Sequence, residues 1–130
     1  MATRISYKNI NRLESLKNSK KPGLGNLLKV LHLLGEPQFK LGKTIIISGT
    51  NGKGTVANIL NRIYVDSGYK VGLYTSPHLV SLNERIRIRD KKIDSRILDS
   101  YLNKVIKAGL RINCKLSFFE LLTATTILYF

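Results

Sequence analysis

The chain has 130 residues, 43% of them hydrophobic, which is enough for a packed core of about one domain and excludes wholesale disorder. Lys and Arg number 22 against 8 Asp and Glu, and the resulting net charge of +14 favours anionic partners such as nucleotides, nucleic acid or an anionic membrane surface. A single cysteine, Cys114, excludes an internal disulfide framework and favours a reducing cytoplasm. The longest apolar run, 121–130, is too short to span a bilayer, so we expect no membrane partner.

Basic residues are spaced through the N-terminal stretch, with no aromatic stacking pattern among them. Nucleic-acid patches normally gather on one face, so the spread favours a solvated helix surface and no specific nucleic acid partner. The residues concerned are Arg4, Lys8, Arg12, Lys17, Lys20 and Lys21.

The first predicted elements follow a break at 21–23. Leucines recur at helical spacing over 24–34 and predict a helix that ends at Gly35 and Pro37. The β-branched run 44–48 has no polar alternation and predicts a buried central strand of a parallel sheet.

A second helix and two further strands are predicted next. Apolar residues at helical spacing over 56–63 indicate a helix that Gly68 closes, and 70–75 indicates a second buried strand. Residues 85–89 alternate between arginine and isoleucine, so with the turn at 90–92 they predict a half-exposed strand or hairpin with its arginines on one face.

The C-terminal part is predicted to be mainly helical. Asp94 or Ser95 caps a third helix, Gly109 follows its end, and 111–116 is ambiguous between strand and loop. A final helix starts near Ser117 and stays apolar to the last residue. Natural chains rarely finish inside an apolar helix, so we expect an N-terminal piece of a longer protein.

The most specific motif is a glycine-rich loop between the predicted strand and helix, at Ser48-Gly49-Thr50-Asn51-Gly52-Lys53-Gly54-Thr55. Glycines let successive N–H groups turn toward phosphate oxygens, and the helix adds its positive N-terminal end. Lys53 can reach the β- and γ-phosphates of a nucleotide, and the Thr55 hydroxyl can bind Mg²⁺. The motif departs from the general phosphate-loop pattern at Ile47 and Gly54. The alternative is a glycine-rich turn between strand and helix that binds no ligand. A lysine between two glycines at the start of a helix argues against it.

Other polar residues have structural alternatives. Ser117 and Glu120 have the spacing of a capping box, and the residues alone favour that over a metal ligand. His78 alone is a solvated loop residue. The arginines of 85–89 are either solvated or a positive wall for an anionic substrate, with Glu84 as their ion-pair partner.

Three motifs in order resemble those of the folylpolyglutamate synthase and dihydrofolate synthase family, relatives of the Mur ligases. The glycine loop is similar to the family's nucleotide loop, and Gly54 resembles the folate branch. The second motif resembles the family's pterin-contacting loop and consists of Ser76-Pro77-His78-Leu79 with Asn83-Glu84-Arg85-Ile86. The third motif resembles the segment whose glutamate binds Mg²⁺ and is Leu116-Ser117-Phe118-Phe119-Glu120. Residues 23–25 and 33–38 also look like the family's opening.

The resemblance implies an α/β fold, a phosphate-loop doubly wound parallel sheet of the Mur-ligase type. This chain would hold only its N-terminal part, with an incomplete sheet: a leading helical segment, 1–43, and a phosphate-loop portion, 44–130. It implies a cytoplasmic, monomeric ATP-dependent ligase that forms an acyl phosphate and then an amide with L-glutamate. The substrates would be dihydropteroate or folate, L-glutamate and ATP, and the isolated piece would be inactive.

The resemblance also assigns roles to residues. Lys53 is the catalytic residue. The nucleotide is held by Gly49, Thr50, Asn51, Gly52, Lys53, Gly54 and Thr55. The pterin substrate is held by Ser76, Pro77, His78, Asn83, Glu84 and Arg85. Thr55 and Glu120 bind Mg²⁺.

Other functions remain open. The first is another phosphate-loop enzyme, such as a Mur-type amide ligase or a small kinase, against which Gly54 and the Ser-Pro-His-Leu loop argue. The second is a non-enzymatic basic nucleic-acid binder, which the absence of Trp and of interleaved aromatic residues disfavours. The third is a non-functional remnant. Within the resembling family, the residues do not decide whether the first glutamate is added, later ones, or both.

Overall fold

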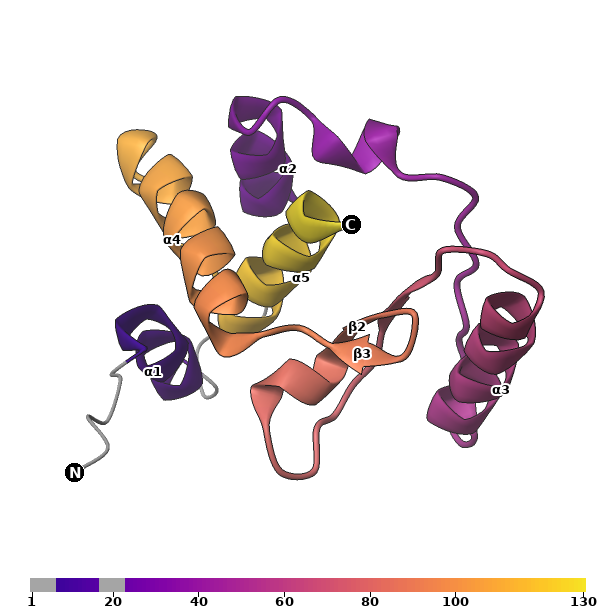
Figure 1. Ribbon diagram of the computed structural model, residues 1–130. Helices are drawn as coiled ribbons and strands as arrows, with labels where there is room; N and C mark the ends of the chain where they lie inside the picture. The colour runs from indigo at the N-terminus through magenta and orange to yellow at the C-terminus, as the bar shows by residue number, and fades with distance from the viewer. Residues whose placement is uncertain (1–6, 17–22) are drawn as a thin grey trace. The chain divides into compact units, whose positions relative to one another are not determined.

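The computed structural model describes residues 7–16 and 23–130, which form two compact units (Figure 1). One unit combines the residues up to Leu41 with Ser95–Tyr129, and the other comprises Gly42–Asp94 with Phe130. The first two residues of the predicted break at 21–23 lie outside the described residues, as do Arg4, Lys17, Lys20 and Lys21. The division at 1–43 and 44–130 stays a prediction.

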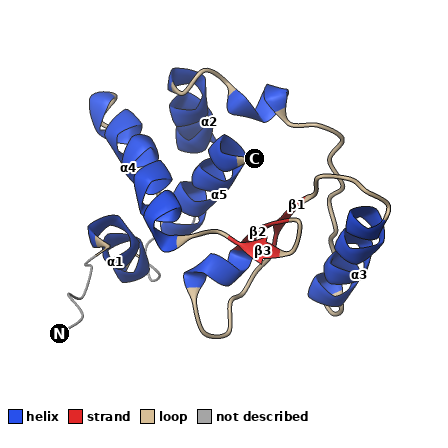
Figure 2. Cartoon of the chain, viewed as in Figure 1, coloured by secondary structure: helices blue, strands red, loops and turns tan. Residues whose placement is uncertain are grey.

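The first unit is a cluster of helices around α5 (Phe118–Tyr129), which contacts α1 (Lys8–Ser15), α2 (Leu24–Leu33) and α4 (Ser95–Arg111) (Figure 2). The predictions of helices over 24–34, from Ser95 and near Ser117 are confirmed. Apolar residues at helical spacing form the core, and burying each large one contributes about 1.5–3 kcal/mol. The fully buried ones are Leu13, Val30, Leu31, Leu98, Leu102, Val105 and Leu122.

Helix α1 is short, and a carboxylate on α4 caps its N-terminus. Asp99 Oδ1 accepts the backbone N–H of Asn9 at 2.9 Å and that of Ile10 at 3.2 Å. The Asn9 amide also donates to Asp99 Oδ2 at 2.9 Å. Because a helix of this length is marginal alone, these bonds and the burial of Leu13 hold it.

Helix α4 runs past Gly109, which was expected to follow its end. Gly109 is buried, and a Cβ atom there would lie 2.9 Å from the Cys114 carbonyl oxygen, so only glycine permits this approach. Asn113 takes the left-handed conformation (φ +50°), and the Cys114 N–H donates to Gly109 O at 2.9 Å. Asn113 thus has the left-handed conformation that was predicted for a glycine after the helix. Of the ambiguous stretch 111–116, Arg111 is the last residue of α4 and 112–116 form a turn and loop.

The second unit contains a small sheet of β1 (Gly72–Tyr74), β2 (Ile86–Ile88) and β3 (Lys91–Lys92), paired antiparallel in that order. Arg89 and Asp90 both have positive φ, +48° and +63°, as the two-residue hairpin turn between right-twisted strands requires. The predicted hairpin is confirmed. The strand predicted over 70–75 forms only at its centre and pairs antiparallel.

The central strand predicted over 44–48 is wrong for this chain, because those residues form no strand. Ile45 is 56% exposed and Ile46 is 88% exposed. The run has strong β propensity, but a strand exists only when neighbours share its backbone hydrogen bonds, and no described residue pairs with it. The parallel pairing expected of it is therefore absent from the described part of the chain.

The arginines do not share one face, in contrast to the expectation from their alternation. Arg85 lies in a 3-10 helix, η2 (Leu82–Arg85), and is only 9% exposed. Arg87 is half-buried in β2, and Arg89 is exposed in the hairpin turn. The strand is too short to hold all of them, so the helix before it and the turn after it redirect the outer two.

Candidate functional site

The glycine-rich loop runs directly into α3 (Lys53–Asp66), within the second unit. Gly49 and Gly52 have φ of +144° and +76°, values that side-chain-bearing residues rarely adopt, so these glycines permit the turn. Gly52 is the N-cap residue, and its carbonyl accepts the Val56 N–H at 2.9 Å. The predicted helix over 56–63 is confirmed, with Gly68 in the left-handed conformation after its end.

The start of α3 has the features of an anion site. Its N-cap makes no side-chain hydrogen bond, and its first turn holds no acidic residue. The first-turn N–H groups of a helix have no intrahelical acceptors, so they can donate to a phosphate. The loop and the first turn, 49–56, are exposed to solvent.

The Lys53 ammonium lies against its own loop. Its Nζ donates to the carbonyl oxygen of Gly49 and, at 3.0 Å, to that of Thr50. These neutral carbonyls leave the positive charge uncompensated. The charge therefore remains available to a phosphate at the same loop.

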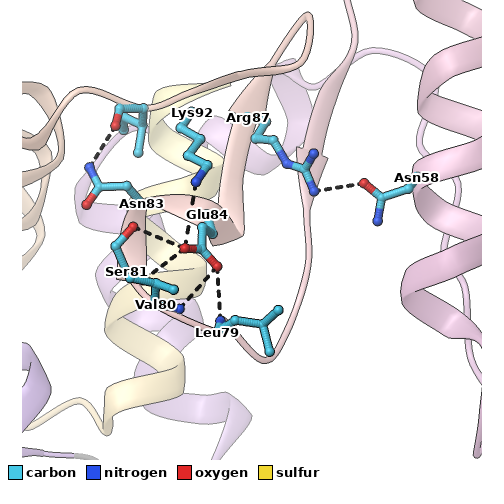
Figure 3. A network of polar contacts seen from close by, with 9 residues as sticks. Asn58, Leu79, Val80, Ser81, Asn83, Glu84, Arg87 and Lys92 are labelled. Carbon is cyan, nitrogen blue, oxygen red and sulfur yellow. Dashed lines mark hydrogen bonds and ion pairs between the residues drawn. The ribbon is translucent and has the colours of Figure 1, made fainter.

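Glu84 organises the second candidate segment, 76–85, through the contacts that Figure 3 shows. The segment follows β1 and begins with a cis Ser76–Pro77 peptide. Its carboxylate accepts the backbone N–H groups of Leu79 and Ser81, each at 3.0 Å, and of Val80 at 3.5 Å. These bonds, first that of Leu79 and then that of Ser81, lower the pKa of Glu84 to about 2.

Among the described residues, Glu84 forms its ion pair with Lys92 of β3, at 3.7 Å, and not with an arginine (Figure 3). The expectation that Glu84 pairs with the arginines is therefore wrong. The reason is the fold of the segment: the carboxylate turns inward to cap η2 together with Ser81.

Two more predicted residues of the segment make defined contacts. Arg85 Nε donates to His78 Nδ1 at 2.8 Å, so the structure brings these two together. The Asn83 amide donates to the Ile93 carbonyl oxygen at 2.7 Å, which ties η2 to the end of the hairpin. Ser76 and Pro77 are exposed.

Glu120, in the first unit, forms the predicted capping box. Its Oε2 accepts the Ser117 N–H at 2.9 Å and the Ser117 hydroxyl at 2.7 Å. The side chain is buried, yet its Oε1 has no hydrogen-bond partner among the described residues. The cap uses one oxygen and leaves the other as an available ligand.

A further contact was not predicted from the sequence. Arg87 Nη2 donates to Asn58 Oδ1 of α3 at 2.8 Å (Figure 3). Asn58 lies one helical turn after the glycine loop, and this position was the one signal in the sequence for a role at the loop. Its partner is 29 residues away, and no local pattern indicates it.

The described residues hold no group of three or more His, Cys, Asp or Glu side chains placed to bind a metal ion. None of the helices described in 7–16 and 23–130 is long and apolar enough to cross a membrane.

Known proteins resemble the chain over most of its length. A dihydrofolate synthase/folylpolyglutamate synthase of Buchnera aphidicola subsp. Acyrthosiphon pisum is 39% identical over 106 residues, which cover 80% of this chain and 24% of that protein. The folylpolyglutamate synthetase of Lactobacillus casei matches with a TM-score of 0.87 at 33% identity, over 97% of this chain and 33% of that one. E. coli FolC in complex with DHPP and ADP matches with a TM-score of 0.83 at 31% identity, over 92% and 29%.

The chain belongs to the folylpolyglutamate synthase/dihydrofolate synthase family. No protein-family profile matches it. It spans about a quarter of the length of the curated relatives and about a third of the solved chains. The family likeness confirms the predicted fold class, an α/β fold of the Mur-ligase type represented here by a part with an incomplete sheet.

Proposed function

We propose that the chain supplies the nucleotide loop of an ATP-dependent ligase that joins L-glutamate to dihydropteroate or to folate. One observation carries this proposal: Lys53 stands between two glycines at the start of α3, which has no side-chain cap, in a chain similar to a protein solved with ADP and DHPP. We also predict that the enzyme is cytoplasmic and monomeric.

The reaction follows from the weakness of a carboxylate as an electrophile. A substrate carboxylate oxygen attacks the γ-phosphorus of ATP and ADP leaves, which gives an acyl phosphate. The amine of L-glutamate then attacks the acyl carbon, phosphate leaves, and an amide forms with loss of a proton from nitrogen. The Lys53 ammonium and the first-turn N–H groups of α3 would bind the phosphates and offset charge on the transferring group.

Each of the two predicted metal ligands has, by itself, a chemistry that suits Mg²⁺. Glu120 has a buried carboxylate oxygen without a partner, and the Thr55 hydroxyl is exposed in the first turn of α3. Mg²⁺ commonly uses one or two carboxylates together with phosphate oxygens and water, so a large acidic cluster is not required. Thr55 and Glu120 would hold the ion, which would supply charge neutralisation for the phosphates.

Segment 76–85 would contact the pterin substrate. Ser76, Pro77, His78 and Arg85 would provide the contacting surface, while Asn83 and Glu84 would hold the segment through their bonds to backbone groups. The Arg85–His78 hydrogen bond supports this division of roles, because it fixes two functional side chains against each other.

A phosphate-release assay tests the proposal in an enzyme that carries these residues. We expect release only when ATP, L-glutamate and dihydropteroate or folate are all present, and none with Lys53→Ala. Release with a UDP-sugar carboxylate in place of the pterin would instead support another Mur-type ligase.

A further inference from the structure

Asn58 connects the nucleotide loop to the β2–β3 hairpin through two bonds, of which Figure 3 shows the one to Arg87. Its Nδ2 donates to the Gly54 carbonyl oxygen at 2.6 Å, and its Oδ1 accepts from Arg87 Nη2 at 2.8 Å. Gly54 lies in the first turn of α3 and belongs to the glycine motif, whereas Arg87 is the central residue of β2. A single amide thus bridges two elements that are distant in the chain.

Each contact fixes the other. An amide presents a donor at one end and an acceptor at the other, and guanidinium groups only donate while carbonyls only accept. Turning the Asn58 amide over would set its NH₂ against the guanidinium and its oxygen against the Gly54 carbonyl. Arg87 therefore selects the orientation in which Asn58 can hold Gly54.

A second tie joins the same two elements one turn further along α3. The buried Asn61 amide donates to Asp90 in the hairpin turn, and Arg62 Nη1 lies 3.9 Å from the Asp90 carboxylate. The hairpin is thus attached to α3 at two points along the helix. The second attachment helps to keep Arg87 beside Asn58.

We propose that Asn58, oriented by Arg87, is a positioning residue of the nucleotide loop. It would fix the Gly54 carbonyl and so the first turn of α3, whose N–H groups receive the phosphates. Arg87 would also place a positive charge beside Asn58, one helical turn from Gly54. A positive charge near the N-terminus of a helix is unfavourable, because that end of the macrodipole is itself positive. A bound anion would offset both positive charges. The nucleotide part of this inference rests on the proposed function.

Four variants separate the parts of this bridge. Asn58→Asp keeps an acceptor for Arg87 and removes the donor to Gly54. Arg87→Ala keeps the donor and removes what orients it, whereas Arg87→Lys keeps a charged donor. Lys91→Ala is the matched control, since it removes one positive charge from an exposed position in the same hairpin.

Hydrogen–deuterium exchange of peptides over 49–58 measures the loop without any ligand, and titration calorimetry with ADP and Mg²⁺ measures affinity. Circular dichroism verifies that each variant keeps its helix content. We expect Asn58→Asp and Arg87→Ala to speed exchange over 49–58 several-fold and to weaken ADP binding about fivefold to tenfold. Arg87→Lys should restore part of both, and Lys91→Ala should change neither.

Two results separate the inference from the proposed function. Exchange over 49–58 that is the same in Arg87→Ala as in the wild type would overturn the positioning role, whether or not ADP binds. Faster exchange in the variants of a protein whose wild type does not bind ADP would support the positioning role and contradict the proposed nucleotide function.

Discussion

The Arg85 guanidinium donates from Nε to Nδ1 of His78 at 2.8 Å. A ring nitrogen that accepts a hydrogen bond carries no proton, so the neutral His78 imidazole has its hydrogen on Nε2. Arg85 is only 9% exposed, so its side chain has little freedom to turn away from His78. The arrangement gives the proposed substrate segment a defined imidazole tautomer as well as a charge.

Substitutions in this pair should affect the pterin and spare the nucleotide. We expect His78→Ala and Arg85→Lys, in an active enzyme carrying these residues, to raise KM for the pterin substrate about tenfold or more. Affinity for ADP should stay near that of the wild type, because both side chains belong to segment 76–85 and not to the glycine loop. Steady-state kinetics together with ADP titrations check this. An equal loss of ADP affinity would show that segment 76–85 belongs to the nucleotide site.

The Glu84 carboxylate should make the 76–85 segment sensitive to acid. Its pKa is about 2 in the folded chain against an ordinary 4.5, so the unfolded state binds protons first as the pH falls. The stabilisation is complete above about pH 4.5 and is lost as the pH falls through about 2. We expect Glu84→Gln to speed amide exchange of the segment at pH 6, and this difference to shrink progressively below pH 4.5.

Lys92→Ala is the control for that experiment. Lys92 lies 3.7 Å from the carboxylate and is more than half exposed, so screening by solvent makes its contribution small. It should change the segment little at any pH. A Lys92→Ala effect as large as that of Glu84→Gln would show that the ion pair, and not the backbone hydrogen bonds, holds the segment.

Several features of the fold follow from the sequence. The helices at 24–34, 56–63 and after Ser95 are predictable because their apolar residues recur every three to four positions. The run 44–48 is equally apolar, but a strand depends on partners that no local pattern supplies. The prediction that Gly109 follows the end of its helix was wrong, because glycine has two uses that the sequence does not distinguish. It can end a helix, or it can permit a close backbone approach inside one, as Gly109 does.

The candidate site was predictable to a similar degree. Lys53 and its glycines are adjacent in the chain, and the Ser117–Glu120 cap is local, so both are visible as motifs. The burial of Arg85 and the pairing of Arg87 with Asn58 depend on how η2 and β2 pack. Alternation predicts a face for a side chain, but it cannot predict the end of a three-residue strand.

The two roles inferred for Glu120 can be separated with its cap partner. Glu120→Gln should raise the Mg²⁺ concentration needed for half-maximal turnover, because an amide is a poorer ligand than a carboxylate. Ser117→Ala should lower the stability of the helical unit by about 0.5–2 kcal/mol and leave the Mg²⁺ dependence unchanged. Turnover measured against Mg²⁺, with urea unfolding alongside, gives both readouts. If the two variants shift the Mg²⁺ dependence equally, Glu120 acts only as a cap.

Exposed apolar side chains in the second unit should make the isolated chain associate. Ile46 is 88% exposed, and on α3 Val56, Ile59 and Ile63 are each about half exposed. Val56, Ile59 and Ile63 recur at helical spacing, and exposed apolar surface of this kind favours self-association. We expect concentration-dependent association in sedimentation experiments, reduced by Ile46→Lys, which loses little packing. A chain that stays monomeric at all concentrations would contradict this expectation.

The role of Lys53 is tested most directly by titrating ADP with Mg²⁺ into the wild type and Lys53→Ala, with Lys91→Ala as a control of equal charge. The Lys53 ammonium lies at the glycine loop and the Lys91 ammonium lies in the hairpin, so only the first should bind phosphate. In an active enzyme carrying these residues, Lys53→Ala should lower kcat/KM by several powers of ten. We predict that Lys53→Ala abolishes ADP binding and that Lys91→Ala retains it. Binding by Lys53→Ala within tenfold of the wild type would contradict the assignment of the loop as the nucleotide site.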